Sequence, residues 1–154
     1  MAKTSGDGTS DDGESETFSD VERRAMKERA AELKAHKGGT GSKKQKELQA
    51  ALDRIAEMPD AERVLAEAFH RIVTETAPEL DPKTWYSMPA YAKDGKVVCF
   101  FQAAGKFDAR YCTIGFSDVA ALDDGGLWPT SYAVTTLRKG EEKRVVELVR
   151  RAVG

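Results

Sequence analysis

Cysteine and histidine are scarce in this chain, with two of each among its 154 residues. Two cysteines cannot build the disulfide framework that stabilises many small secreted domains. The histidines, His36 and His70, have no second histidine or cysteine at ligand spacing, which argues against a histidine metal site. No signal-peptide pattern and no apolar run near the roughly 18 residues of a membrane span is present. We therefore expect a cytoplasmic, monomeric protein with free thiols and no membrane partner.

Motifs of catalysis are also missing. No glycine-rich phosphate loop follows a predicted strand, no G-x-S-x-G elbow occurs, and neither histidine lies in a serine or cysteine nucleophile context. Carboxylates occur in pairs, but the sequence places no pair in a pocket. These absences favour a binding protein over an enzyme.

Charge is distributed unevenly along the chain, although the net value is only -2. Residues 1–20 carry -5, residues 21–46 carry +6 and residues 47–154 carry -3. An acidic domain is a poor partner for nucleic acid, so we expect such binding only weakly and in a salt-sensitive way, through the basic segment 21–46.

Composition divides the chain into four segments. Residues 1–18 are polar and acidic, too poor in apolar side chains to fold, and are expected to be disordered. Residues 19–37 are rich in alanine and charge and predict a helix with a thin apolar face. A glycine-rich linker is predicted over 38–43, and a folded α+β domain over 44–154.

Hydrophobic periodicity within that domain changes from helical to strand-like at Pro82. Capping-box spacing at Ser42 predicts a first helix that ends at Pro59. A broad apolar stripe predicts a second helix over 60–76, with His70 opposite the stripe. The residues of the stripe are Val64, Leu65, Ala68, Phe69, Ile72, Val73 and Thr76. Short β-rich runs follow, at 87–92, 96–103, 110–116 and 132–137, and a terminal helix at 141–153 is expected to pack beside the 60–76 helix. Pro89 marks the first run as an edge strand. The fold class is an antiparallel sheet of four to five strands with two or three helices on it.

Ordered motifs in this region resemble those of the YdhG-like proteins. They are KTWYSMPAY, DGKVVCFFQ, the pairs KF and RY, IGFSD, and DDG followed by WP. The domain is similar over residues 44–154 to this family, domain of unknown function 1801 in the YjbR/CyaY-like superfamily. The resemblance implies an antiparallel sheet with helices, related in outline to frataxin. It also implies a frataxin-like iron chaperone that binds iron transiently and passes it to an iron–sulfur assembly partner.

Iron requires several oxygen ligands close together. Asp53, Glu57 and Asp60 are spaced by four and three around the Pro59 break and are the candidate metal ligands. Two other acidic groups could also supply such ligands: Glu75, Glu79 and Asp81, and Asp118, Asp123 and Asp124. The alternative is that arginines among the helical acids, Arg54, Arg63 and Arg71, make these residues an ordinary ion-paired surface.

The two cysteines lie in neighbouring strand-like runs. If Gly105 and Lys106 form a tight turn, Cys99 and Cys112 are directly opposite one another on paired strands. We favour a structural role, because free cysteine behaves as a small buried hydrophobe. Redox or soft-metal use is the alternative, although the C-x-x-C spacing typical of reactive thiols is missing.

Aromatic residues are dense in the strand region and suggest another kind of site. An aromatic sheet face with a few fixed charges could bind a small ligand or single-stranded nucleic acid. The alternative is that these side chains form the core. The candidate ligand-binding residues are Trp85, Tyr86, Tyr91, Lys106, Arg110, Tyr111 and Trp128. Iron binding would depend on the carboxylates, and ligand binding on these aromatic residues.

Overall fold

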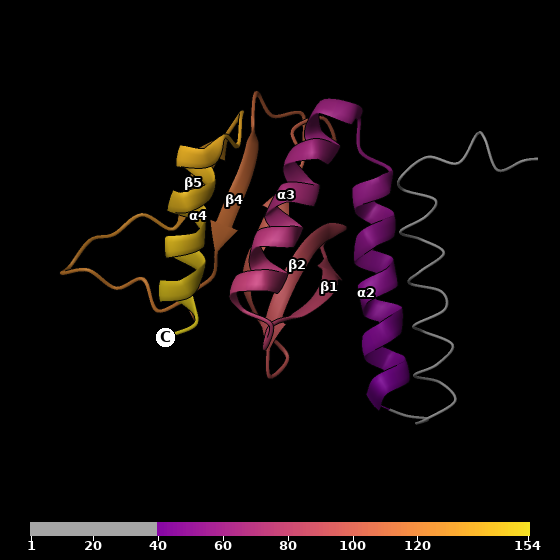
Figure 1. The fold of residues 1–154 in the computed structure, drawn as a ribbon, viewed down its shortest axis with the longest axis horizontal. Coiled ribbons are helices and arrows are strands. Elements are labelled where there is room, and N and C mark those ends of the chain that lie inside the picture. Colours follow the sequence, from indigo (N-terminus) through magenta and orange to yellow (C-terminus); the bar gives the residue numbers. More distant parts are fainter. Residues whose placement is uncertain (1–39) are drawn as a thin grey trace, which may run out of the picture.

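The computed structural model describes residues 40–154 (Figure 1). The acidic tail predicted over 1–18 and the helix predicted over 19–37 lie outside the described residues. The linker prediction, 38–43, is wrong in its second part, because helix α2 already begins at Thr40. Packing of α2 along the first strand of the sheet offsets the cost of placing Gly41 in a helix.

Two helices precede the sheet, α2 (Thr40–Ala56) and α3 (Asp60–Thr76). Pro59 separates them and occupies the N-cap position of α3, where its missing N–H costs no hydrogen bond. The buried side of α3 contains Leu65, Ala66, Phe69, Ile72 and Val73, which confirms the predicted stripe. Val64 was predicted to belong to it but is 60% exposed.

The sheet contains five antiparallel strands in the order β1-β2-β3-β4-β5. Their bounds are β1 (Asp81–Trp85), β2 (Met88–Lys93), β3 (Lys96–Gln102), β4 (Cys112–Phe116) and β5 (Ser131–Val134). The expected α+β class and antiparallel sheet are therefore confirmed. β1 was not predicted, since the first strand-like run was expected only at 87–92.

The prediction that Pro89 marks an edge strand is wrong. β2 lies between β1 and β3, and β1 is the edge. Pro89 pairs with Thr84 of β1, whereas the pairing of β2 with β3 begins at Ala90. At Pro89, β2 is therefore paired with β1 alone. Because no β3 ladder needs an N–H at this position, an inner strand can contain the proline.

The predicted pairing of the two cysteines is also wrong. Cys99 is opposite Phe116, at the far end of β4 from Cys112, which is opposite Val134 of β5. Gly105 and Lys106 belong to a long connection over 103–111, not to a tight turn. Both thiols are buried, and burial raises the pKa of each. Protonated, buried thiols fit the structural role that we favoured.

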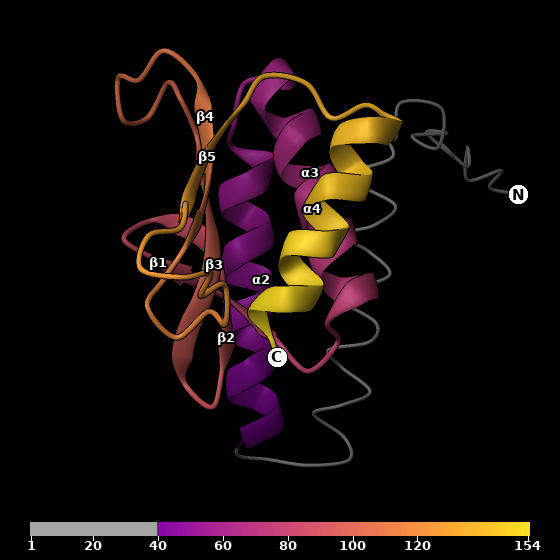
Figure 2. The ribbon, with the colours of Figure 1, turned by 90° about the vertical axis from the view of Figure 1, so that its left-hand side faces the viewer.

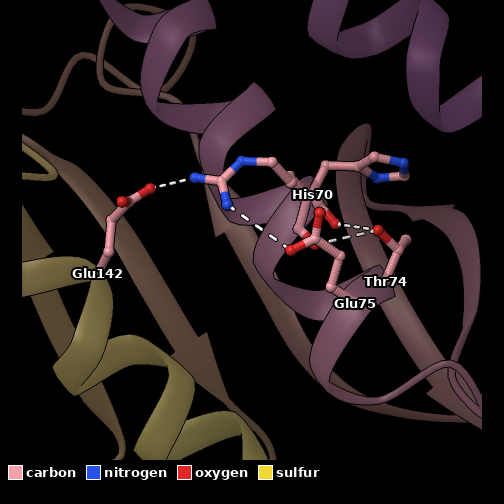
Figure 3. A network of polar contacts seen from close by, with 5 residues as sticks. His70, Thr74, Glu75 and Glu142 are labelled. Carbon is pink, nitrogen blue, oxygen red and sulfur yellow. Dashed lines mark hydrogen bonds and ion pairs between the residues drawn. The ribbon is translucent and has the colours of Figure 1, made fainter. Parts of the chain in front are cut away.

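All three described helices cover the same face of the sheet (Figure 2). The last helix, α4 (Lys139–Ala152), lies beside α3 as predicted, and buries Val145, Val149 and Ala152. Arg71 of α3 reaches across to Glu142 of α4 and also to Glu75, 3.8 Å away (Figure 3). The opposite face of the sheet has no described helix on it. Among residues 40–154, no helix is long and apolar enough to span a membrane.

Candidate functional site

The candidate ligand-binding residues are divided among four places. Trp85 ends β1 and Tyr86 follows in the turn. Tyr91, in β2, is fully buried and packs against Phe69 of α3, so its prediction as part of an exposed face is wrong. The remaining four are in connections: Lys106, Arg110 and Tyr111 between β3 and β4, and Trp128 between β4 and β5.

The structure instead assembles a smaller group that we call the aromatic cluster: Trp85, Tyr86 and Phe100. The ring of Trp85 lies 4.8 Å from that of Tyr86 and 5.3 Å from that of Phe100, centroid to centroid. Strand alternation places Phe100 on the opposite side of β3 from Phe101, whose ring packs against Phe69 of α3. The aromatic cluster therefore lies on the face of the sheet that lacks described helices.

Small residues beneath these rings make the cluster possible. Ala90 of β2 is paired with Lys83 on one side and Phe100 on the other, and is fully buried. Gly115 of β4 is opposite Phe100, and a Cβ there would lie 2.2 Å from Cζ of the phenylalanine ring. Phe100 can lie across β4 only because position 115 has no side chain.

The turn that presents Tyr86 has an unusual backbone. Tyr86 and Ser87 join β1 to β2 with φ angles of 49° and 63°. Two-residue hairpin turns with positive φ at both positions normally contain asparagine, aspartate or glycine. Neither residue here is of those types, so the turn stores strain, a feature that often accompanies functional sites. Its effect is to hold Tyr86 76% exposed beside Trp85.

Lysines lie at the border of this cluster. A hollow of about 440 Å³ is lined by Trp85, Lys83 and Lys96, and on its other side by Ser117, Asp118 and Val119. Within residues 40–154 neither lysine makes an ion pair. With one aspartate against two lysines, the hollow favours a ligand that has an aromatic surface and a negative charge.

Sequence reasoning missed Phe100 and Lys83. The run of residues 96–103 contains adjacent phenylalanines, and alternation alone cannot say which of them faces the helices. Recognition of β1 would have resolved this, because Lys83 and Trp85 then pair with β2 and place their face of the sheet beside Phe100.

The candidate metal ligands are spread over the surface. Asp53 accepts a hydrogen bond from Gln49 at 2.9 Å, Glu57 pairs with Arg54 at 3.1 Å, and Asp60 pairs with Arg63 at 3.1 Å. Arg63 also lies 3.6 Å from Glu67, which matches the ion-paired surface considered as the alternative. In the part of the chain that the structure describes, no group of three or more histidine, cysteine or acidic side chains is arranged to hold a metal ion.

His70 was predicted to lie opposite the apolar stripe, and this is wrong. The residue is half-buried, and its Nδ1 lies 2.9 Å from the Tyr91 hydroxyl. Its carbonyl oxygen accepts a hydrogen bond from Thr74 at 2.9 Å, drawn in Figure 3. Burial lowers the pKa of His70 from 6.5 to about 4 and raises that of Tyr91. Both groups are therefore neutral at pH 7 and join α3 to the centre of the sheet.

This pair predicts a loss of stability in mild acid. As the pH falls from 6.5 towards 4, His70 takes up a proton in the unfolded chain but not in the folded one. The full pKa shift would lower the free energy of unfolding by about 3 kcal/mol. Because His70 is partly exposed, we expect a smaller loss of about 1–2 kcal/mol. Urea unfolding of wild type and His70→Gln at several pH values isolates this contribution, since the carboxylate titrations cancel in the difference. A difference independent of pH between 4 and 7 would contradict the assignment.

The chain was also compared with known proteins. No family model, no curated protein and no solved structure matches it. Membership of the YdhG-like family thus stays a prediction, and a functional proposal must come from the geometry of the described residues.

Proposed function

We propose that this protein binds a nucleotide, either free or within a single strand, on the aromatic cluster. The observation that carries the proposal is Tyr86, which a strained turn holds exposed beside Trp85. Burial alone does not explain that arrangement, because most of the Tyr86 side chain is in solvent. A base that stacks on such a surface gains about 1–3 kcal/mol.

The lysines supply the second half of the recognition. Lys83 and Lys96 line the hollow next to Trp85, where they can pair with a phosphate while the base stacks on Tyr86 or Trp85. Lysine acts on phosphate as a flexible point charge, so this contact should add affinity without selecting a sequence. Binding should consequently weaken as salt is raised.

Iron binding, the function that the resemblance implies, depends on Asp53, Glu57 and Asp60. Each of these carboxylates has a hydrogen-bond or ion-pair partner three or four residues away in the sequence. No observation on the described residues favours an iron site, so the aromatic cluster is the better-supported site.

The test uses the full chain and two probes, a nucleoside monophosphate and a fluorescently labelled single-stranded oligonucleotide. With Trp128→Phe as background, Trp85 is the sole tryptophan and its fluorescence reports the nucleotide. Anisotropy reports the oligonucleotide. We expect saturable binding of at least one probe, and Tyr86→Ala should weaken it about tenfold.

Tyr111→Ala is the matched control, because Tyr111 is 36% exposed but lies in the β3–β4 connection. It should leave binding unchanged. Binding of the oligonucleotide alone would identify single strands as the ligand, and binding of both would identify the nucleotide unit. The proposal would be overturned if neither probe showed saturable binding. It would also be overturned if Tyr86→Ala and Tyr111→Ala weakened binding equally.

A further inference from the structure

A separate cavity lies between the α2–α3 turn and the sheet. Its volume is about 410 Å³, within the range of small-molecule sites. Most of its wall is apolar and comes from three segments: Met58 and Pro59 of the helix turn, Met88 and Pro89 of β2, and Phe101, Ala103 and Phe107 of β3 and the connection after it. The aromatic cluster does not contribute to it.

Hydrogen bonds from two sides fix the shape of this cavity. At the helix turn, the N–H groups of Glu62 and Arg63 donate to the carbonyl of Pro59, at 3.0 and 2.8 Å. On the other side, the N–H of Gly105 donates to the Glu62 carboxylate at 2.6 Å. Glu62 therefore attaches the β3–β4 connection to the start of α3. The cavity is preformed, which lowers the entropy lost when a ligand binds.

Charged groups of both signs lie at this cavity. Arg54, Glu57 and Lys106 all line it. Arg54 donates to Glu57 through Nη1 at 3.1 Å, and within residues 40–154 its other N–H groups make no side-chain hydrogen bond. Lys106 is exposed and forms no ion pair with any described residue. The nearby Glu62 carboxylate accepts the N–H of Gly105 and so is already engaged. The remaining N–H groups of Arg54 and the ammonium group of Lys106 therefore favour an anion at the opening.

We infer that this cavity binds a small amphipathic carboxylate, such as a medium-chain fatty acid anion. The apolar chain lies among Met58, Phe101 and Phe107, where it leaves water. The carboxylate lies at Arg54 and Lys106. An arginine that already holds one carboxylate through a single nitrogen has further N–H groups for a second. None of the residues proposed to contact the nucleotide lines this cavity, although Ser87, which follows Tyr86 in the β1–β2 turn, does.

Decanoate is the probe, titrated into full-length protein below its micelle-forming concentration and followed by amide NMR and calorimetry. Decanol and decylamine test the charge. We expect saturable shifts at residues that line the cavity, with decanoate bound more tightly than decanol and decylamine bound least.

Two variants separate the contributions. Lys106→Gln should weaken the binding of decanoate about threefold and leave the affinity for decanol unchanged. Phe107→Ala should weaken both about five- to tenfold by removal of apolar contact. Because Lys106 and Phe107 are exposed, neither change threatens folding. Lys83→Gln, at the aromatic cluster, is the control and should have no effect.

Shifts confined to other surfaces, no saturation, or decylamine bound as tightly as decanoate would overturn the inference. Failure here would leave nucleotide binding unaffected, and loss of nucleotide binding in Tyr86→Ala should leave decanoate binding intact. The two proposals can therefore fail separately.

Discussion

Replacement of Phe69 by alanine is expected to lower the free energy of unfolding by about 3–5 kcal/mol. Phe69 is fully buried at the centre of α3. Its ring meets that of Tyr91 edge-on at 5.6 Å and that of Phe101 at 6.3 Å, so it joins the helix layer to two strands. Truncation removes these contacts and leaves a cavity that the neighbouring rings fill only in part.

Urea unfolding of full-length wild type and variant, followed by circular dichroism, measures this loss. Val64→Ala is the matched control, since Val64 is on the same helix but 60% exposed, and should cost less than about 0.5 kcal/mol. If Phe69→Ala does not fold, Phe69→Leu, which removes fewer contacts, serves instead. Equal losses for positions 69 and 64 would show that the packing of α3 is described wrongly.

Gly115→Val is expected to be the second most damaging change, at about 3 kcal/mol. Valine favours strands, so propensity alone predicts a gain. The contacts predict the reverse, because the new Cβ would lie 2.2 Å from Cζ of Phe100. Either the phenylalanine leaves its position beside Trp85 or β3 and β4 separate, and both alternatives cost stability.

A double-mutant cycle identifies Phe100 as the cause. Gly115→Val should cost much less in a Phe100→Ala background, where the clash is gone. Gly126→Val is the control for valine itself, since no atom lies within 4 Å of a Cβ at that position. Fully additive costs of Gly115→Val and Phe100→Ala would be inconsistent with the packing described.

The helices were the most predictable part of the fold. Residues 60–76 repeat apolar side chains at helical spacing, and α3 has those bounds. β1 was missed because neither the strand nor the turn after it has the usual sequence pattern. It contains Pro82, and the turn after it consists of Tyr86 and Ser87, which have no turn signal. Strand pairing stabilises a backbone there that the two residues would not adopt alone.

Two of the three residues of the aromatic cluster were among the predicted ligand-binding residues, and the reason for the errors lies in β2. Trp85 and Tyr86 belong to the cluster, whereas Tyr91, predicted with them, lies on the other face. Residues 88–92 are all buried, so the strand shows no alternation from which to assign faces. An irregularity between Tyr91 and Ala92 interrupts the pairing with β3 as well. Only the three-dimensional structure separates Tyr91 from Trp85.

The strand order has a consequence for how the chain folds. Every hydrogen-bonded pair of strands in the sheet is also consecutive in sequence. The first two connections contain only residues 86–87 and 94–95, so closing these hairpins costs little entropy. We expect β1, β2 and β3 to pair early. All five strands lie between α3 and α4 in the sequence. The contact between these two helices should therefore form late and limit the folding rate.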